Sequence, residues 1–117
     1  MSSVVLYHNP RWGKSRRVVA LLEENDVVFK VIEYLKNPLG KDEVLQLSKK
    51  LKKKPIDFIR KNDLDFKNNI LDKDILNDNK MAELITQFPK IMERPILVVG
   101  KNAVIGRPPE NVLNLLN

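Results

Sequence analysis

The chain has 117 residues, of which 43% are hydrophobic and 31% charged, a composition typical of one globular domain with a core of its own. It contains no cysteine, which excludes disulfides, thiolate metal sites and thiol chemistry by the chain itself. No apolar run approaches the roughly 20 residues that span a bilayer. We therefore expect residues 1–117 to form a single cytoplasmic domain that does not enter a membrane.

Positive charge is in excess, because 21 Lys and Arg against 15 Asp and Glu give a net charge of +6. Lysines crowd residues 49–54, and this run favours the solvated C-terminal end of a helix, where cations are stabilised by the helix dipole. A basic balance can also indicate nucleic acid. We do not expect nucleic-acid binding, since the chain has neither interleaved aromatic residues for base stacking nor a DNA-reading motif.

The first third of the chain has the pattern of a strand, a helix and a second strand. Residues 4–7 are apolar and suit a buried strand, and residues 27–35 are nearly all apolar and suit another. Between them an apolar face with helical spacing is formed by Val18, Val19, Leu21 and Leu22. Strand, helix and strand in this order predict a βαβ unit with parallel strands.

The middle of the chain has three helical segments. Val44, Leu47, Ser48 and Leu51 follow the helical period, and Pro55 ends that helix before a short helical turn over 56–59. Residues 61–79 are polar with scattered apolar residues, and we expect an irregular connection with one helical turn. A further helix is predicted from Asn79 to Pro89.

The last third predicts a β-hairpin, formed by residues 96–99 and 103–105 around Gly100, and a closing helix that begins at Pro109. The complete order is then β-α-β, three helical segments, β-β and α. Its natural solution is an α/β domain with a four-stranded mixed sheet flanked by helices, of thioredoxin type.

The loop between the first strand and the first helix holds the candidate functional residues. It turns through Asn9 and Pro10 and enters a helix at Gly13. Such a turn directs several backbone N–H groups and the positive end of a helix at one point, where anions bind. We therefore predict an anion site at this loop.

Four blocks of sequence, in order, resemble one family along essentially the whole chain. They are Tyr7-His8-Asn9-Pro10 with Gly13, Ser15 and Arg16; Ile59-Arg60-Lys61-Asn62; Arg94-Pro95-Ile96; and Gly106-Arg107-Pro108-Pro109-Glu110. By these blocks the chain is identified as a member of the glutaredoxin-dependent arsenate reductase (ArsC) family, a thioredoxin-fold group that includes the Spx-type transcriptional regulators.

The resemblance implies an active site in the opening loop. In the family, a cysteine thiolate attacks arsenate, glutathione resolves the adduct and glutaredoxin completes the reduction. Here that cysteine is matched by Trp12. His8 and Ser15 match two residues that favour the thiolate.

The resemblance also implies an oxyanion pocket and one unusual peptide bond. Arg60, Arg94 and Arg107 match three arginines that hold the oxyanion in the family. Arg94–Pro95 matches the cis-proline that precedes a strand in thioredoxin folds, and a cis bond here would bring Arg94 against the opening loop. The alternative for Arg94 and Arg107 is pairing with acidic neighbours on the surface.

Tryptophan cannot replace cysteine in this chemistry, because the reaction needs a nucleophile and the indole N–H is only a donor. We therefore predict no arsenate reduction, no metal or cofactor, and no use of glutathione or glutaredoxin. What remains is a small-oxyanion site for phosphate, sulfate or arsenate, or a protein-binding surface, on a monomer. Without a thiol, His8 is expected to be a structural histidine hydrogen-bonded beside the loop.

Two alternatives stay open. One is a Spx-like regulator that binds RNA polymerase or another protein, although the Cys-X-X-Cys redox pair of many such regulators is absent. The other is a recent change of sequence, since tryptophan and cysteine codons differ by one base. The indole of Trp12 could lie across the pocket, stack on Arg11 or on one of the matched arginines, or point to solvent.

Overall fold

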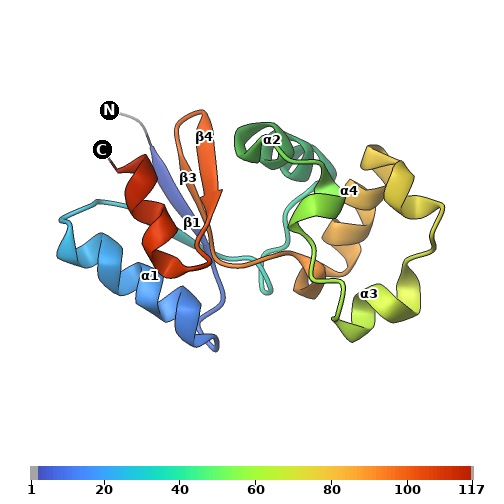
Figure 1. Ribbon diagram of the computed structural model, residues 1–117, viewed down its shortest axis with the longest axis horizontal. Coiled ribbons are helices and arrows are strands. Elements are labelled where there is room, and N and C mark those ends of the chain that lie inside the picture. Colours follow the sequence, from blue (N-terminus) through green and yellow to red (C-terminus); the bar gives the residue numbers. More distant parts are fainter. Residues whose placement is uncertain (1–2, 117) are drawn as a thin grey trace. The chain divides into compact units, whose positions relative to one another are not determined.

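The computed structural model describes residues 3–116 of the chain, which divides into two compact units. The first unit joins Met1–Tyr34 to Arg94–Asn117, and the second is Leu35–Glu93. All four strands belong to the first unit (Figure 1): β1 (Val4–His8), β2 (Lys30–Glu33), β3 (Ile96–Val99) and β4 (Asn102–Ile105).

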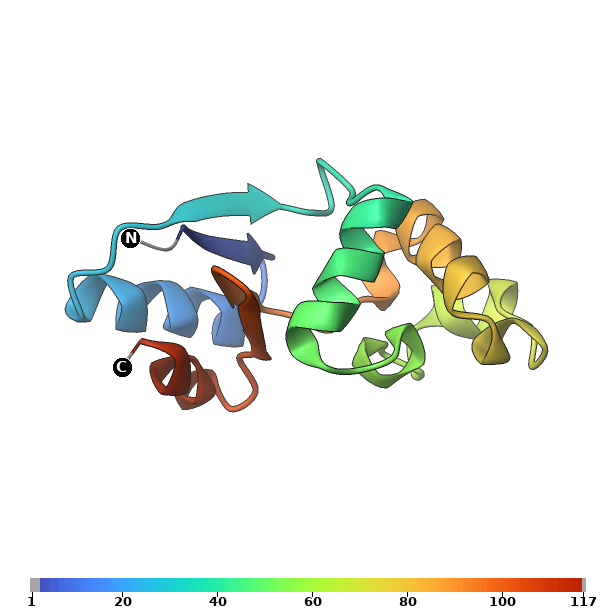
Figure 2. The same cartoon turned by 90° about the horizontal axis from the view of Figure 1, so that it is seen from above.

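The strands form one mixed sheet in the order β2-β1-β3-β4, which can be followed in Figure 2 from the cyan strand to the orange hairpin. β1 and β2 are parallel, with Leu6 opposite Val31, whereas β3 is antiparallel to both β1 and β4. Gly100 has a φ of 58° in the turn of the hairpin, a conformation that glycine adopts without strain. The predicted α/β class, its four-stranded mixed sheet, the parallel first pair and the hairpin are confirmed.

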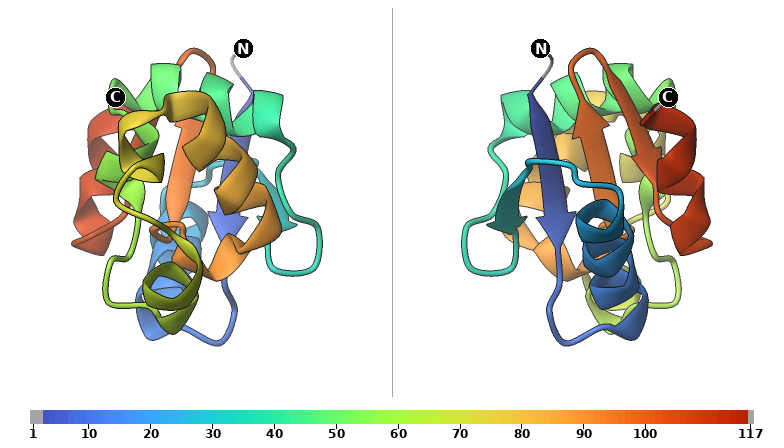
Figure 3. Two further views of the ribbon diagram at one scale, coloured as in Figure 1. Left: turned by 90° about the vertical axis from the view of Figure 1, so that its right-hand side faces the viewer. Right: turned by 90° about the vertical axis from the view of Figure 1, so that its left-hand side faces the viewer.

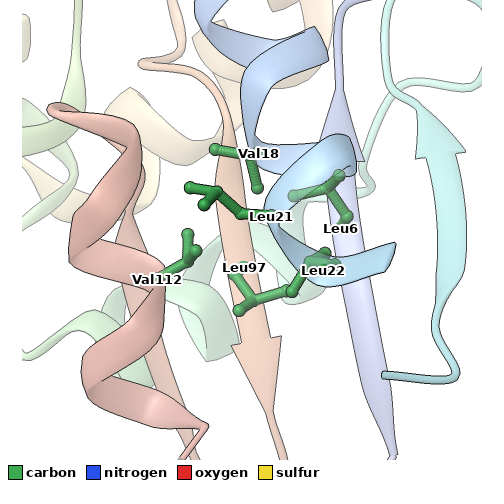
Figure 4. Packing of buried hydrophobic residues seen from close by; sticks show 6 residues of the cluster. All are labelled: Leu6, Val18, Leu21, Leu22, Leu97 and Val112. Carbon is green, nitrogen blue, oxygen red and sulfur yellow. The ribbon is translucent and has the colours of Figure 1, made fainter. Parts of the chain in front are cut away.

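Two helical elements lie side by side on one face of this sheet (Figure 3, right): α1 (Gly13–Glu24) and the 3₁₀ helix η4 (Pro109–Leu115). Their apolar residues meet those of β1 and β3 in a single buried cluster (Figure 4). The cluster consists of Leu6, Val18, Leu21, Leu22, Leu97 and Val112. This burial fixes the direction in which α1 leaves the loop after β1, and so fixes the candidate site.

Two expectations for the first unit need correction. The second strand is shorter than the apolar run of residues 27–35, since β2 covers only Lys30–Glu33 and Val28 is 93% exposed. The closing helix has 3₁₀ geometry, although it begins with Pro109 as predicted. Apolar residues indicated that both segments are structured. They did not indicate where the strand begins and ends, or whether the helix is α or 3₁₀.

The second unit is helical, and its centre is the contact of α2 (Lys41–Leu51) with α4 (Asp78–Gln87). The short 3₁₀ helix η1 (Pro55–Phe58) packs against α4. Buried residues of α2 are Val44, Leu47 and Leu51, at the spacing that predicted this helix. The lysine run lies where it was expected, with Lys49 and Lys50 in the last turn of α2.

The segment 61–79 contains the predicted helical turn, but it is more ordered than the irregular connection that we expected. It contains α3 (Leu64–Asn69), the 3₁₀ helix η2 (Asp74–Leu76) and the first residues of α4. α3 has no buried residue, so it lacks the apolar stripe by which helices are recognised. A third 3₁₀ helix, η3 (Pro89–Ile91), follows α4. None of the helices in residues 3–116 has the length and apolar character needed to cross a membrane.

Candidate functional site

The loop after β1 is held by its own backbone and by two side chains. Asn9 accepts two backbone hydrogen bonds, through its carbonyl from Trp12 N (3.1 Å) and through Oδ1 from Arg11 N (3.1 Å). These bonds form the tight Asx-type turn that asparagine favours. The turn places Trp12 at the N-cap of α1, where its side chain makes no cap hydrogen bond because indole has no acceptor for a backbone N–H.

Ser15 lies in the first turn of α1 and is fully buried. Its Oγ accepts a hydrogen bond from Asn9 N at 3.4 Å, so it ties the beginning of the loop to the helix that follows. The structure therefore brings Ser15 to the loop, as the resemblance predicted. Its hydroxyl contacts the backbone of Asn9, so Ser15 shapes the loop, and this role requires no thiolate.

Trp12 is half-buried and is the point at which cationic groups converge. The guanidinium carbon of Arg94 lies 4.3 Å from the centroid of its ring and that of Arg107 lies 5.0 Å away. Lys14 Nζ is 5.7 Å from the same centroid. The sequence left three orientations of the indole open, and in the structure the ring lies against two of the matched arginines, Arg94 and Arg107.

These contacts differ in strength because their surroundings differ. A cation over an indole contributes about 0.5–1 kcal/mol where it is exposed and about 2 kcal/mol where water is excluded. Arg94 is only 8% exposed and is the nearest, whereas Arg107 and Lys14 are exposed. The Arg94–Trp12 contact is therefore the strongest of the three.

The two arginines are positioned by neighbouring backbone segments. Arg94–Pro95 is a cis peptide bond, as predicted, and Arg107–Pro108 is a second one that was not predicted. Gly106 N donates to Pro95 O at 2.8 Å and joins the two segments. A Cβ at Gly106 would lie 2.9 Å from Val18 Cγ2 and 3.0 Å from Pro95 Cγ, so only glycine allows this close approach.

His8 ends β1 and is 8% exposed. We expected the ring of His8 to be hydrogen-bonded. Its Nδ1 is instead buried without a hydrogen-bond partner among residues 3–116. Burial lowers the pKa of His8 below its ordinary 6.5, against the opposing effect of Glu33 and with a smaller lowering by Arg16. A neutral imidazole is thus favoured here.

Arg60 belongs to the second unit, unlike Arg94 and Arg107. Its Nη1 forms an ion pair with Asp63 Oδ2 at 3.0 Å and a longer hydrogen bond to Lys90 O at 3.4 Å. Pairing with an acidic neighbour, the alternative raised for Arg94 and Arg107, is thus observed at Arg60, and for the other two arginines it stays open. Its role toward an anion stays a prediction from the resemblance.

The arrangement around Trp12 is a cluster of positive charge without a nucleophile. No cysteine is present in the sequence, and residues 3–116 contain no group of three or more His, Asp or Glu side chains placed to hold a metal. Guanidinium groups bind tetrahedral oxyanions by charge-assisted, often bidentate hydrogen bonds. The chemistry that these residues support is therefore anion binding.

One contributor to the cluster, Lys14, and one property of His8 were missed from the sequence. Lys14 follows Trp12 in the first turn of α1, and its position directly after the loop could have indicated it. The unpartnered Nδ1 of His8 left no signal, because hydrogen bonding of one ring nitrogen depends on packing between elements.

The four-stranded mixed sheet with flanking helices defines a thioredoxin-like α/β protein, and comparison with known proteins defines its family. The ArsC family model matches residues 7–115. The arsenate reductase of Haemophilus influenzae is 36% identical over 115 residues, covering 97% of this chain and 99% of the relative. The Escherichia coli K12 protein YfgD is 38% identical over 115 residues, covering 97% and 96%.

Solved structures agree with the sequence relatives. The structure of an arsenate reductase from Vibrio cholerae matches with a TM-score of 0.83 and 34% identity, covering 97% of each chain. An ArsC-related protein from Bacteroides fragilis shares the fold at a TM-score of 0.82, with 15% identity. This chain belongs to the ArsC family.

Proposed function

We propose that this chain is an oxyanion-binding member of the ArsC family that does not reduce arsenate. The observation that carries the proposal is the convergence of Arg94, Arg107 and Lys14 on Trp12, all within 5.7 Å of one ring centroid. Guanidinium and ammonium groups gathered at one ring can donate charge-assisted hydrogen bonds to a tetrahedral anion. Phosphate, sulfate and arsenate have the required charge and shape.

The absence of reduction follows from the residue at the loop. The family's reaction needs a thiolate that forms a covalent adduct and later leaves, and this sequence has no thiol at any position. Indole offers no comparable lone pair. Glutathione and glutaredoxin would then have no adduct to resolve.

The chain contains one tryptophan, so its fluorescence reports on the candidate site alone. We expect titration with inorganic phosphate or arsenate, at constant ionic strength, to change the emission of Trp12 with saturation. Arg107→Ala should weaken binding about tenfold, because charge-assisted hydrogen bonds are removed. The matched control is Arg17→Ala, which removes the same charge from the exposed, Glu24-paired side of α1 and should leave affinity unchanged.

A linear response that sodium chloride reproduces would contradict the proposal. So would equal loss of affinity in the Arg107 and Arg17 variants, since that result would indicate general charge attraction and no defined site.

A further inference from the structure

We infer that the indole of Trp12 occupies the place of the anion between Arg94 and Arg107, and that an anion binds only when this ring moves aside. The inference rests on the proposed function and makes Trp12 the residue that sets the affinity of the site. It concerns a contact peculiar to a chain with tryptophan at this position.

The backbone segments that carry Arg94 and Arg107 are held together. Gly106 N bonds Pro95 O at 2.8 Å, and Asn111 Nδ2 donates to Arg107 O at 3.1 Å. Gly106 also packs against Val18 and Pro95 without room for a Cβ. The segments carrying Arg94 and Arg107 therefore cannot separate easily to make room for a ligand.

The indole of Trp12 fills space beside both guanidinium groups. Its centroid is 4.3 Å from one guanidinium carbon and 5.0 Å from the other, so the ring is in contact distance of both groups. An oxyanion that contacts both guanidinium groups from the side of the loop needs the volume that the ring fills. The negative face of the indole stands in for the anion there.

The side chain of Trp12 can move, whereas its backbone cannot. The backbone of Trp12 is fixed, because its N donates to Asn9 O and its carbonyl accepts from Arg16 N, each at 3.1 Å. Its side chain makes no cap hydrogen bond and is only half-buried, so the ring can change place by rotation about its side-chain torsions while the backbone stays fixed. The indole is thus a side-chain gate on an otherwise rigid site.

The test is calorimetric titration of wild type, Trp12→Ala and Trp12→Phe with inorganic phosphate and with arsenate at one ionic strength. Trp12→Ala should bind about tenfold more tightly, because no ring contact has to be broken first. Trp12→Phe keeps an aromatic ring at the site and should remain closer to wild type. Trp12→Ser serves as a second small variant if the alanine variant does not fold, judged by its amide NMR spectrum.

The wild type supplies an independent readout. Saturating phosphate should raise the quenching of Trp12 fluorescence by acrylamide, since the displaced ring enters solvent. Equal or weaker binding by the small variants, or unchanged or lower quenching in wild type, would overturn the gate while leaving anion binding in place. Absence of binding in every protein would overturn the proposed function and the gate together.

Discussion

At the scale of single residues, His8 offers a prediction that its surroundings determine. Burial lowers its pKa, so between the folded-state pKa and the ordinary value of 6.5 the unfolded chain binds more protons than the folded chain. The contribution of His8 to stability is therefore fully present above 6.5 and is lost as the pH falls through that window.

As the chain has one histidine, its imidazole C–H resonance can be followed without ambiguity by NMR. We expect its titration midpoint below 6.5. His8→Gln should remove the corresponding fall in the urea unfolding midpoint between neutral and mildly acidic pH. A midpoint at or above 6.5 would show that Glu33 outweighs burial.

The sequence predicted the position of a residue where that residue belongs to a family motif, but it did not predict the contacts of the side chain. Trp12, Ser15 and Arg94 were placed at the loop through the resemblance, and the structure brings them there. The stacking partners of the indole were left open, because they depend on side-chain torsions. The ion pair of Arg60 with Asp63 is local, three residues apart, and could have been anticipated from spacing.

At the scale of elements, the junction of β3, β4 and α1 is the most constrained part of the first unit. Gly106→Ala would introduce a Cβ 2.9 Å from Val18 Cγ2, and overpacking of this kind costs about 1–3 kcal/mol. The measurement is the free energy of unfolding in urea. Anion affinity should fall as well, because the segments of Arg94 and Arg107 would shift.

Gly13→Ala is the matched control at the first residue of α1. The nearest atom to an added Cβ there is Arg16 Nη2 at 3.7 Å, an ordinary contact with a flexible group. Alanine in place of glycine stabilises a helix interior by about 0.5–1 kcal/mol, so at this first position we expect no destabilisation. Equal effects of the two substitutions would contradict the close packing that we assign to Gly106.

The elements that the sequence predicted well are those with a buried stripe. α1, α2 and α4 bury residues at helical spacing, and the hairpin has a turn glycine between apolar strands. The extent of α3 was not predicted because none of its residues is buried. The helix begins after Asp63, whose side chain accepts a hydrogen bond from Asp65 N at 2.9 Å. A cap of this kind is visible in sequence only when a helix is already suspected.

At the scale of the whole molecule, family membership and fold agree along nearly the full chain, with a TM-score of 0.83 to a relative that covers 97% of it. A single cytoplasmic domain and a monomeric state stay predictions. The Spx-like alternative also stays a prediction. It can be tested by a pull-down that compares wild type with a variant in which the lysines of residues 52–54 are changed to glutamate.

We propose above all that this chain retains the family's anion site and lacks only its nucleophile. The most direct measurement compares wild type with Trp12→Cys in a glutathione- and glutaredoxin-dependent arsenate reduction assay. We expect wild type to match the rate without protein and Trp12→Cys to exceed it, because a thiolate at the helix N-terminus beside Arg94 and Arg107 restores the missing step. Reduction by wild type, or no reduction by a folded Trp12→Cys protein, would contradict the account.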